Sequence, residues 1–485
     1  MRTRSLQQIA ELVEAGGQPC QAVGDPGTPI GPDVLIDSRE TTDGALFVAL
    51  PGERVDGHDY VAAAAELGAH AAMVTHRVDA PIAQLICPDA QQGLTALARS
   101  LHARARADGL QTVAITGSAG KTSTKDLLAQ ILAAAGPTVS PEGSHNNELG
   151  TPLTVCQVDP TTRYLVSEMG ARAIGDIAYL TSIVHPTASV VLNIGTAHIG
   201  EFGSQDNIAK AKGEIVEALD ADGWAILNAD DPRVDAMVSR TRAHIAKFSL
   251  AADAGPIDAE LVVRARNLTA DDLDRYSFTL DCSRPGARQA GESAKVRLRV
   301  LGEHQVSDAV ASATAALALG LDLETVATAL SEAGARSRWR MELHELANGA
   351  AVINDAYNAN PESMAAALRT VAAIGVRRRQ RNPGARTMAV LGDMLELGEV
   401  SGKLHFEVGE LAARLGYTEI VAVGAFAEDL AQGARSAGGS SRVAEARDAA
   451  DSLNLQSSDV VLVKASRGLR LEKVAEQLIG GEDIR

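Results

Sequence analysis

The sequence lacks the features of several other protein classes. Positive charge is in deficit: 45 Lys and Arg residues stand against 62 Asp and Glu residues, giving a formal net charge of −17 at pH 7. This deficit argues against a nucleic-acid-binding surface, so anionic substrates must be held by individual Lys and Arg side chains. No apolar run approaches the ~20 residues of a membrane span, and the first residues have the spacing of an amphipathic helix, not of a signal peptide. We therefore expect a cytoplasmic protein without membrane insertion.

Cysteine is scarce as well. The four cysteines, Cys20, Cys87, Cys156 and Cys282, lie far apart, and no two of them have C-x-x-C spacing. A disulfide framework or a zinc site needs clustered or regularly spaced cysteines. We therefore predict isolated, buried thiols in a reducing compartment, without disulfides or zinc.

The stretch 112–124 is the clearest functional signal that is present. It opens with a β-branched apolar run typical of a buried strand, turns at Gly117 and Gly120, and continues as a helical pattern. A glycine-rich turn before a helix offers free backbone N–H groups and the positive end of the helix dipole to a phosphate. The spacing is shorter than the strict P-loop pattern, which leaves an ordinary strand–turn–helix junction as the alternative, but Gly-Lys-Thr at this junction favours a phosphate site with Thr122 near a Mg²⁺ ion. The predicted nucleotide-binding residues are Thr116, Gly117, Ser118, Ala119, Gly120, Lys121, Thr122 and Ser123.

Three polar residues follow later apolar runs, as expected at the carboxyl edge of a parallel sheet. Glu168 ends the run 164–168, His198 comes shortly after the run 189–194, and Asn228 lies at the tip of a third. Glu168 is placed like the acidic residue that holds Mg²⁺ in P-loop enzymes. Lone histidines are usually structural, but the position of His198 favours a metal ligand.

Two lysines, Lys210 and Lys212, lie on a helix expected over residues 207–216. Lysines on a helix are usually solvated. Residues two apart on a helix point in different directions, so at most one of the pair faces the site.

The length and the alternation of strands and helices predict an α/β protein of three domains. Residues 1–87 form a small α/β domain, in which Asp37, Ser38 and Arg39 either bind an anionic ligand or form a plain strand-to-turn junction. Residues 88–334 form a central domain with a mainly parallel sheet and a small antiparallel section between 260 and 300. Residues 335–485 form a doubly wound, Rossmann-like domain. Two surface loops are expected at 377–384 and 436–441, the first with an arginine cluster.

Three further stretches carry a resemblance to a known family. They are Ser144-His-Asn-Asn-Glu-Leu-Gly-Thr-Pro152, Asp355-Ala-Tyr-Asn-Ala-Asn-Pro-Glu-Ser-Met364 and Leu391-Gly-Asp-Met-Leu-Glu-Leu-Gly398. Together with the phosphate loop, Glu168 and His198, they resemble the Mur ligase superfamily over essentially the whole chain. The middle stretch is most similar to the members that act on UDP-MurNAc-tripeptide and D-Ala-D-Ala.

The resemblance implies an ATP-dependent enzyme that forms an amide bond in bacterial cell-wall synthesis. ATP would phosphorylate the terminal carboxylate of the tripeptide, and the amine of the dipeptide would attack the acyl phosphate. Two Mg²⁺ ions would be held by Thr122, Glu168, His198 and Lys212, the last carbamylated by CO₂. These residues and Lys121 are the implied catalytic group, and a monomer is expected.

The resemblance also implies binding roles for residues elsewhere in the chain. The nucleotide would contact residues from the central and last domains: Asn228, Arg340 and Asp355. The acceptor peptide would pass Asn146 and Asn147, while its UDP-sugar end would meet Asp37, Ser38, Arg39 and the loop from Gly52 to His58. The dipeptide would be held by Asn358, Asn360, Lys464, Ser466 and Arg467.

One departure from the family pattern weakens the expected adenine contact. The family motif has two asparagines where this chain has Gln305 and Asp308. An asparagine amide both donates and accepts, whereas an ionised aspartate only accepts. Three readings therefore compete with the dipeptide ligase: a sister ligase that adds a single amino acid, a folylpolyglutamate synthetase, and a catalytically silent nucleotide-binding scaffold.

Overall fold

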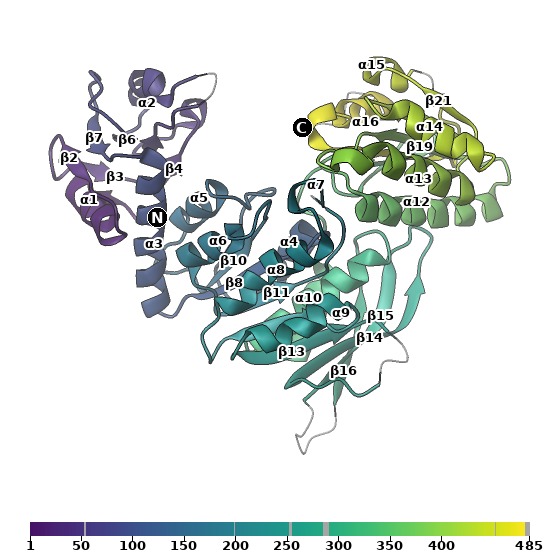
Figure 1. The fold of residues 1–485 in the computed structure, drawn as a ribbon, viewed down its shortest axis with the longest axis horizontal. Coiled ribbons are helices and arrows are strands. Elements are labelled where there is room, and N and C mark those ends of the chain that lie inside the picture. The colour runs from purple at the N-terminus through teal and green to yellow at the C-terminus, as the bar shows by residue number, and fades with distance from the viewer. Residues whose placement is uncertain (53–54, 198, 252–254, 285–290, 452, 481–485) are drawn as a thin grey trace.

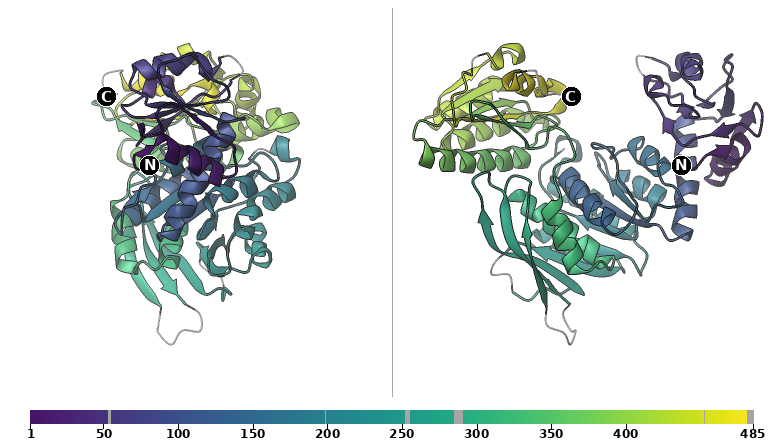
Figure 2. Two further views of the ribbon diagram at one scale, coloured as in Figure 1. Left: turned by 90° about the vertical axis from the view of Figure 1, so that its left-hand side faces the viewer. Right: turned by 180° about the vertical axis from the view of Figure 1, so that it is seen from behind.

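The computed structural model describes residues 1–485 except 53–54, 198, 252–254, 285–290, 452 and 481–485. Three sheets follow one another along the chain and build three lobes (Figure 1). The first and last lobes both stand above the central one, as the view from behind also shows (Figure 2). Among the described helices, none has the length and apolar character needed to cross a bilayer. The predicted α/β class is confirmed.

The first sheet is parallel except at one edge. Its order is β2–β7–β6–β5–β4, and only β2 and β7 are antiparallel. The strand expected up to Arg39 is shorter than predicted, because Asp37 accepts a hydrogen bond from the Arg39 N–H and starts a 3-10 helix. The elements of this lobe are β1 (Arg4–Ser5), α1 (Leu6–Ala15), β2 (Gln21–Val23), β3 (Pro29–Ile30), β4 (Val34–Leu35), η1 (Ser38–Glu40), β5 (Leu46–Val48), η2 (Gly57–Tyr60), α2 (Val61–Glu66), β6 (Ala71–Val74) and β7 (Ala83–Ile86).

A long helix, α3 (Ala90–Ala107), leads from the first sheet to the central one. It begins where the Asp89 side chain accepts a hydrogen bond from the Gln92 N–H, as a helix N-cap does. Its apolar residues join one hydrophobic cluster with α1 and with helices of the central lobe. The helix is therefore shared by the first two lobes.

The central sheet has nine strands in the order β16–β15–β14–β13–β12–β11–β8–β10–β9. Pairing is parallel from β9 to β14 and antiparallel among β14, β15 and β16. The predicted antiparallel section is thus confirmed, and it continues the parallel sheet. The strands are β8 (Gln111–Thr116), β9 (Thr138–Val139), β10 (Tyr164–Glu168), β11 (Ala188–Val191), β12 (Trp224–Asn228), β13 (His244–Ser249), β14 (Leu261–Ala270), β15 (Tyr276–Ser283) and β16 (Glu292–Arg297).

Helices cover both faces of this sheet. Ala114 packs into the cluster on one face and its neighbour Ile115 into the cluster on the other, as the alternation of a strand requires. The Ile115 face is covered by α4 (Lys121–Ala133), α10 (His304–Ala318) and α11 (Leu323–Glu332). The Ala114 face carries α5 (Gly150–Cys156), α6 (Asp176–Val184) and α8 (Gln205–Glu217), and the short elements are α7 (Ile199–Phe202), α9 (Pro232–Asp235) and η3 (Ala236–Arg240).

The last sheet is doubly wound, as predicted. Its order is β17–β18–β22–β19–β20–β21, with only β17 antiparallel, and apolar clusters cover both faces. Its elements are β17 (Glu342–Glu345), β18 (Ala351–Asp355), α12 (Pro361–Arg381), β19 (Thr387–Gly392), η4 (Gly398–Val400), α13 (Ser401–Arg414), β20 (Glu419–Val423), α14 (Ala427–Ser436), β21 (Ser441–Val443), α15 (Ala446–Ala449), β22 (Val460–Lys464), η5 (Arg467–Leu469) and α16 (Glu472–Ile479).

The loop expected at 377–384 is wrong for its first half. Residues 377–381 are the last turn of α12, and their arginines are paired. Arg377 lies 2.9 Å from the Asp274 carboxylate in the turn between β14 and β15, and Arg381 pairs with Asp272 of the same turn. The arginine cluster therefore joins the last lobe to the central one.

Candidate active site

The turn between β8 and α4 has the shape of an anion site. Gly120 has a φ of +85°, which glycine adopts without strain, and α4 begins at the next residue. Asn193, just beyond β11, accepts hydrogen bonds from the Ser118 and Ala119 N–H groups at 3.0 and 2.9 Å. The Lys121 ammonium folds back onto the Gly117 carbonyl at 2.8 Å. The turn and the start of α4 can therefore offer backbone donors and an ammonium to a phosphate.

Glu168 lies at the end of β10, fully buried beside this turn. Its carboxylate accepts hydrogen bonds from the hydroxyls of Thr122 at 2.8 Å and Ser144 at 2.6 Å, and from the Asn146 amide at 2.7 Å. Burial alone would raise the pKa of Glu168, but the charges of Lys121 and Arg340 outweigh it and lower that pKa. The side chain is therefore an anion in a ready position to bind a cation.

Lys212 and Lys210 have different surroundings, as their spacing predicted. Lys212 is 3% exposed and faces the same cavity as the phosphate turn, whereas Lys210 is exposed. Burial, and then the charge of Lys121, lower the pKa of Lys212 well below its ordinary value. Within the described part of the chain, the Lys212 ammonium has no hydrogen-bond or ion-pair partner. The other predicted metal ligand, His198, lies outside the described residues.

The last lobe contributes a second group of charged and aromatic side chains. Asp355, at the end of β18, forms a buried ion pair with Lys464 of β22 at 2.6 Å. The Arg340 guanidinium lies 4.2 Å from the ring centroid of Tyr357. Arg467 lies at the same distance over Trp339, and it also forms a 2.6 Å ion pair with Glu472. Such stacking holds both guanidinium groups in defined positions.

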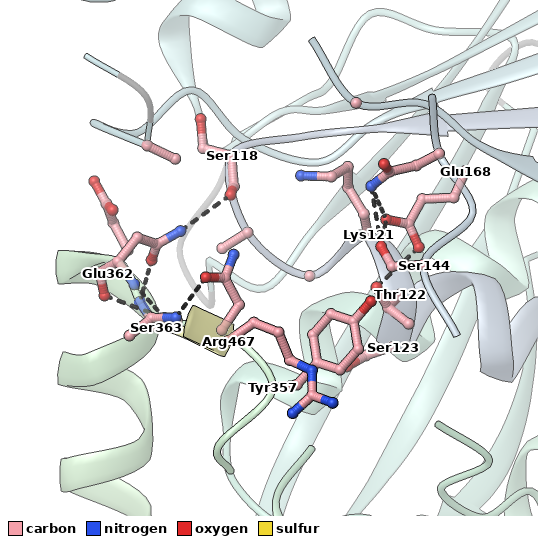
Figure 3. A pocket seen from close by; sticks show the side chains of 18 of the residues that line it. Ser118, Lys121, Thr122, Ser123, Ser144, Glu168, Tyr357, Glu362, Ser363 and Arg467 are labelled. Carbon is pink, nitrogen blue, oxygen red and sulfur yellow. Dashed lines mark hydrogen bonds between the residues drawn. The ribbon is translucent and has the colours of Figure 1, made fainter. Parts of the chain in front are cut away.

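Contacts between the central and last lobes close the site. At the start of α12, Glu362 accepts hydrogen bonds from the N–H and hydroxyl of Thr196 at 2.6 and 2.7 Å. The Asn360 amide, which caps the same helix, reaches the Ser118 carbonyl at 3.3 Å. Figure 3 shows Lys121, Thr122 and Glu168 across the cavity from Glu362 and Ser363. The two lobes are therefore in contact at the phosphate turn itself.

One cavity of about 860 Å³ lies between the two lobes and collects most of the predicted site residues. Its lining contains Ser118, Ala119, Gly120, Lys121, Thr122, Ser123, Asn146, Asn147, Glu168, Lys212, Arg340, Asp355, Asn358, Asn360, Lys464, Ser466 and Arg467.

Six predicted residues lie elsewhere. Thr116 is buried against the Met169 carbonyl, and Gly117 precedes the lining part of the turn. The Asn228 amide donates to the Leu192 carbonyl at 2.8 Å and lies outside the lining. In the first lobe, Asp37 and Arg39 form a 2.5 Å ion pair with each other, and neither they nor Ser38 reach this cavity.

The altered motif residues Gln305 and Asp308 also line the cavity, beside the phosphate turn. Asp308 is 5% exposed, and its Oδ2 atom has no hydrogen-bond partner among the described residues. Burial raises the pKa of Asp308 to about 8. A neutral carboxyl both donates and accepts, as the family's asparagine amide does, so the substitution retains the hydrogen-bonding capacity. Gln305 donates to the Ser123 hydroxyl at 3.4 Å.

Sequence reasoning missed several residues that shape the site. Asn193 directly follows β11, and Glu362 lies within the recognised stretch 355–364, so both had a positional signal. Ser144 likewise opens a recognised stretch. The stacking partners Tyr357 and Trp339 had no signal beyond being aromatic residues in a chain with 3% aromatics.

Family models match three consecutive segments of the chain. Residues 33–115 match the Mur ligase family catalytic domain, residues 115–316 the Mur ligase middle domain, and residues 339–467 the Mur ligase glutamate ligase domain. Among curated relatives, the UDP-N-acetylmuramoyl-tripeptide–D-alanyl-D-alanine ligase of Mycobacterium tuberculosis is 39% identical, with 99% of this chain and 98% of that protein covered. The ligase of the same name from Escherichia coli is 33% identical over 92% and 93% of the two chains.

Solved structures agree over the whole chain. MurF from Acinetobacter baumannii superposes with a TM-score of 0.83 at 31% identity and covers 99% of both chains. MurF ligase from Thermotoga maritima, solved in complex with ADP, gives a TM-score of 0.72 at 27% identity over 92% of this chain and 97% of that one. The similarity in sequence and in structure is thus continuous through all three lobes, and the chain belongs to the Mur ligase family.

Proposed function

We propose that this chain is an ATP-dependent ligase that joins D-alanyl-D-alanine to the tripeptide of UDP-N-acetylmuramoyl-tripeptide, a step in peptidoglycan precursor synthesis. One observation carries the proposal: a single cavity has the phosphate turn and Glu168 on one wall and the cationic group of the last lobe on the other. A reaction between a nucleotide and two further substrates needs such a shared space. Full-length similarity to ligases of that name supports this choice of substrates.

The proposed nucleotide site is built on the start of α4. Its free N–H groups and helix dipole would receive the phosphates, and Lys121 would leave the Gly117 carbonyl to lie along them. Arg340 and Asp355 would contact the nucleotide from the last lobe. Asn228 stays in the proposal as a contact that requires its present bond to Leu192 to break.

The residues present suit a Mg²⁺ site. Glu168 is an anion whose oxygens already accept from Thr122 and Ser144, so hard oxygen ligands converge there. Bound Mg²⁺ would neutralise the phosphate charge during transfer. A second ion would need an anion at Lys212, and a lysine with a strongly lowered pKa has the neutral amine that combines with CO₂ to give a carbamate and a proton. We therefore assign Thr122, Glu168, carbamylated Lys212 and His198 to two Mg²⁺ ions.

The two amide-forming substrates are assigned to opposite sides of the cavity. Asn146 and Asn147, on the central lobe, would line the path of the acceptor peptide. The UDP end would extend toward Asp37, Ser38 and Arg39 in the first lobe. The dipeptide would meet the last lobe, where cations for its carboxylate and amides for its backbone stand together: Asn358, Asn360, Lys464, Ser466 and Arg467.

The proposed chemistry follows from this arrangement. The acceptor carboxylate attacks the terminal phosphate of ATP and gives an acyl phosphate and ADP. The dipeptide amine then attacks the acyl carbon, and the tetrahedral intermediate expels phosphate to leave the amide. Contacts such as Glu362 with Thr196 keep the lobes together and exclude water, which would otherwise hydrolyse the acyl phosphate. We further propose domain limits near residues 87 and 334, a cytoplasmic location and a monomer.

Phosphate release by the purified protein tests the proposal. ATP, Mg²⁺, UDP-MurNAc-tripeptide and D-Ala-D-Ala are supplied together and then omitted one at a time. We expect release only with all four, and a pentapeptide product by mass spectrometry. Release with a single amino acid in place of the dipeptide would identify a sister ligase. Absence of turnover in every mixture would favour a silent nucleotide-binding scaffold.

A further inference from the structure

Two cysteines of the first lobe lie opposite each other. β2 and β7 are antiparallel, with Gln21 opposite Ile86, and one more residue in the same register places Cys20 opposite Cys87. Both side chains belong to the same apolar cluster, and both are free thiols. The prediction of isolated thiols is therefore wrong for this pair, because register, which brings residues far apart in sequence together, cannot be read from cysteine spacing.

The pair has the geometry that a disulfide needs. Residues directly opposite in an antiparallel pair have Cα atoms about 4.5 or 5.5 Å apart. Both distances fall within the range of about 4.4–6.8 Å that disulfides span. On the far side of Cys87, Gly93 of α3 leaves room for the sulfur, since a Cβ atom at that position would lie 2.9 Å from the Cys87 Sγ.

The two thiols also differ in reactivity. A hydrogen bond between them raises the pKa of Cys20 and lowers the pKa of Cys87, which makes Cys87 the thiolate. The thiolate is the nucleophile of cysteine chemistry. By contrast, burial raises the pKa of Cys156 to about 12, and burial raises the pKa of Cys282 as well. Cys87 is thus the one thiol of the four whose surroundings favour reaction.

We propose that Cys20 and Cys87 form a redox site that closes to a reversible disulfide in the presence of a peroxide. The Cys87 thiolate attacks the peroxide oxygen and becomes a sulfenic acid, releasing hydroxide when the oxidant is hydrogen peroxide. The Cys20 sulfur then attacks the Cys87 sulfur, and water leaves. In sum, two thiols and one hydrogen peroxide give one disulfide and two water molecules.

The disulfide would join the edge strand β2 covalently to β7. β2 lies at the end of its sheet and Cys20 is 8% exposed, so local opening of this edge admits a small oxidant. β7 leads directly into α3, whose Gln91 and Gln92 line the central cavity. Oxidation would therefore fix the junction through which the first lobe is connected to the active site.

The wild-type protein provides the test, because no variant is needed to observe the bond. The full chain is treated with hydrogen peroxide, alkylated and digested with trypsin, which places Cys20 in the peptide 5–39 and Cys87 in the peptide 78–99. We expect these two peptides to be linked, with a mass lower by about 2 Da than their sum. A thiol reductant should separate them. The oxidised protein should also unfold at a higher temperature, since the bond constrains the unfolded chain.

Matched variants separate this pair from the other thiols. Cys20→Ser and Cys87→Ser should each abolish the linked peptides, whereas Cys156→Ser and Cys282→Ser should leave them unchanged. If a serine variant does not fold, alkylation of the reduced wild type by a labelled reagent before and after peroxide still reports which thiols are lost. Irreversible addition of oxygen at either cysteine without linked peptides, or linkage through Cys156 or Cys282, would overturn the proposal.

Discussion

At the scale of the residue, Asp308 connects protonation to nucleotide binding. Its pKa, raised to about 8 by burial, leaves it neutral at pH 7 and ionised above about pH 8. The charged groups that face it are Lys121 at the start of α4 and Arg340 from the last lobe, with His304 on its own helix. Because the folded pKa lies above the ordinary 3.8, the favourable neutral state is present at low pH and is lost as pH rises through about 8.

The pH dependence of ADP binding checks this assignment. Above its pKa, Asp308 is a second anion beside the phosphate turn, so the affinity should fall by about tenfold per pH unit. Calorimetric titration between about pH 7 and about pH 9 should show this fall for the wild type and a flat profile for Asp308→Asn. Asp206→Asn, which changes a side chain that is 90% exposed, is the control and should behave as the wild type. Parallel profiles for the wild type and Asp308→Asn would contradict the assignment.

Lys212 is the second residue with a specific chemical prediction. Its neutral amine is expected to carry a carbamate, so Lys212→Ala should lower kcat by more than about 100-fold. Acetate or formate should restore part of the rate, because a small carboxylate can occupy the space of the carbamate. Lys210→Ala, two residues away and exposed, should retain the wild-type rate. Steady-state phosphate release measures all three, and an inactive Lys212→Ala that no carboxylate rescues would count against the carbamate.

At the scale of the element, the phosphate turn depends on Gly120. A Cβ atom there would lie 2.3 Å from Asp308 Oδ1, and the φ of +85° would strain any other residue. Gly120→Ala should therefore weaken ADP binding by at least about tenfold, since the turn must shift away from α10. Gly109→Ala is the matched control, with a φ of +100° and open space around it. Equal ADP affinities in the two variants would show that backbone strain alone decides.

The start of α12 is the element that holds the lobes together through Glu362. Removing its carboxylate in Glu362→Ala breaks both bonds to Thr196 and should open the cavity. We expect a larger radius of gyration by X-ray scattering in the presence of ADP, together with a higher KM for the dipeptide. Glu428→Ala, in an exposed pair on α14, should change neither quantity. An unchanged radius would mean that other contacts suffice for closure.

At the scale of the whole molecule, sequence patterns predicted the elements better than their contacts. Buried strands of parallel sheets are continuous apolar runs, so β8, β10 and β22 were readable. β13 was missed because His244 and Lys247 interrupt its apolar residues. The arginines after residue 376 indicated a loop, and only their partners in the β14–β15 turn explain why the helix continues to Arg381.

The site shows the same division. Gly-Lys-Thr and Glu168 could be predicted because strand ends of one sheet converge on one edge. The bond between Glu362 and Thr196 depends on how two lobes meet, and the contact between Cys20 and Cys87 on a register; neither follows from local pattern. The raised pKa of Asp308 requires knowledge of its burial, which residue type alone suggested in the opposite sense.

Transfer of a heavy-oxygen label tests the central claim, that the two walls of the cavity cooperate through an acyl phosphate. The terminal carboxylate of UDP-MurNAc-tripeptide is labelled, and the reaction is run to completion with ATP, Mg²⁺ and D-Ala-D-Ala. The account predicts one labelled oxygen in the released inorganic phosphate for each amide formed, detected by mass spectrometry. Unlabelled phosphate, or label in AMP, would contradict it.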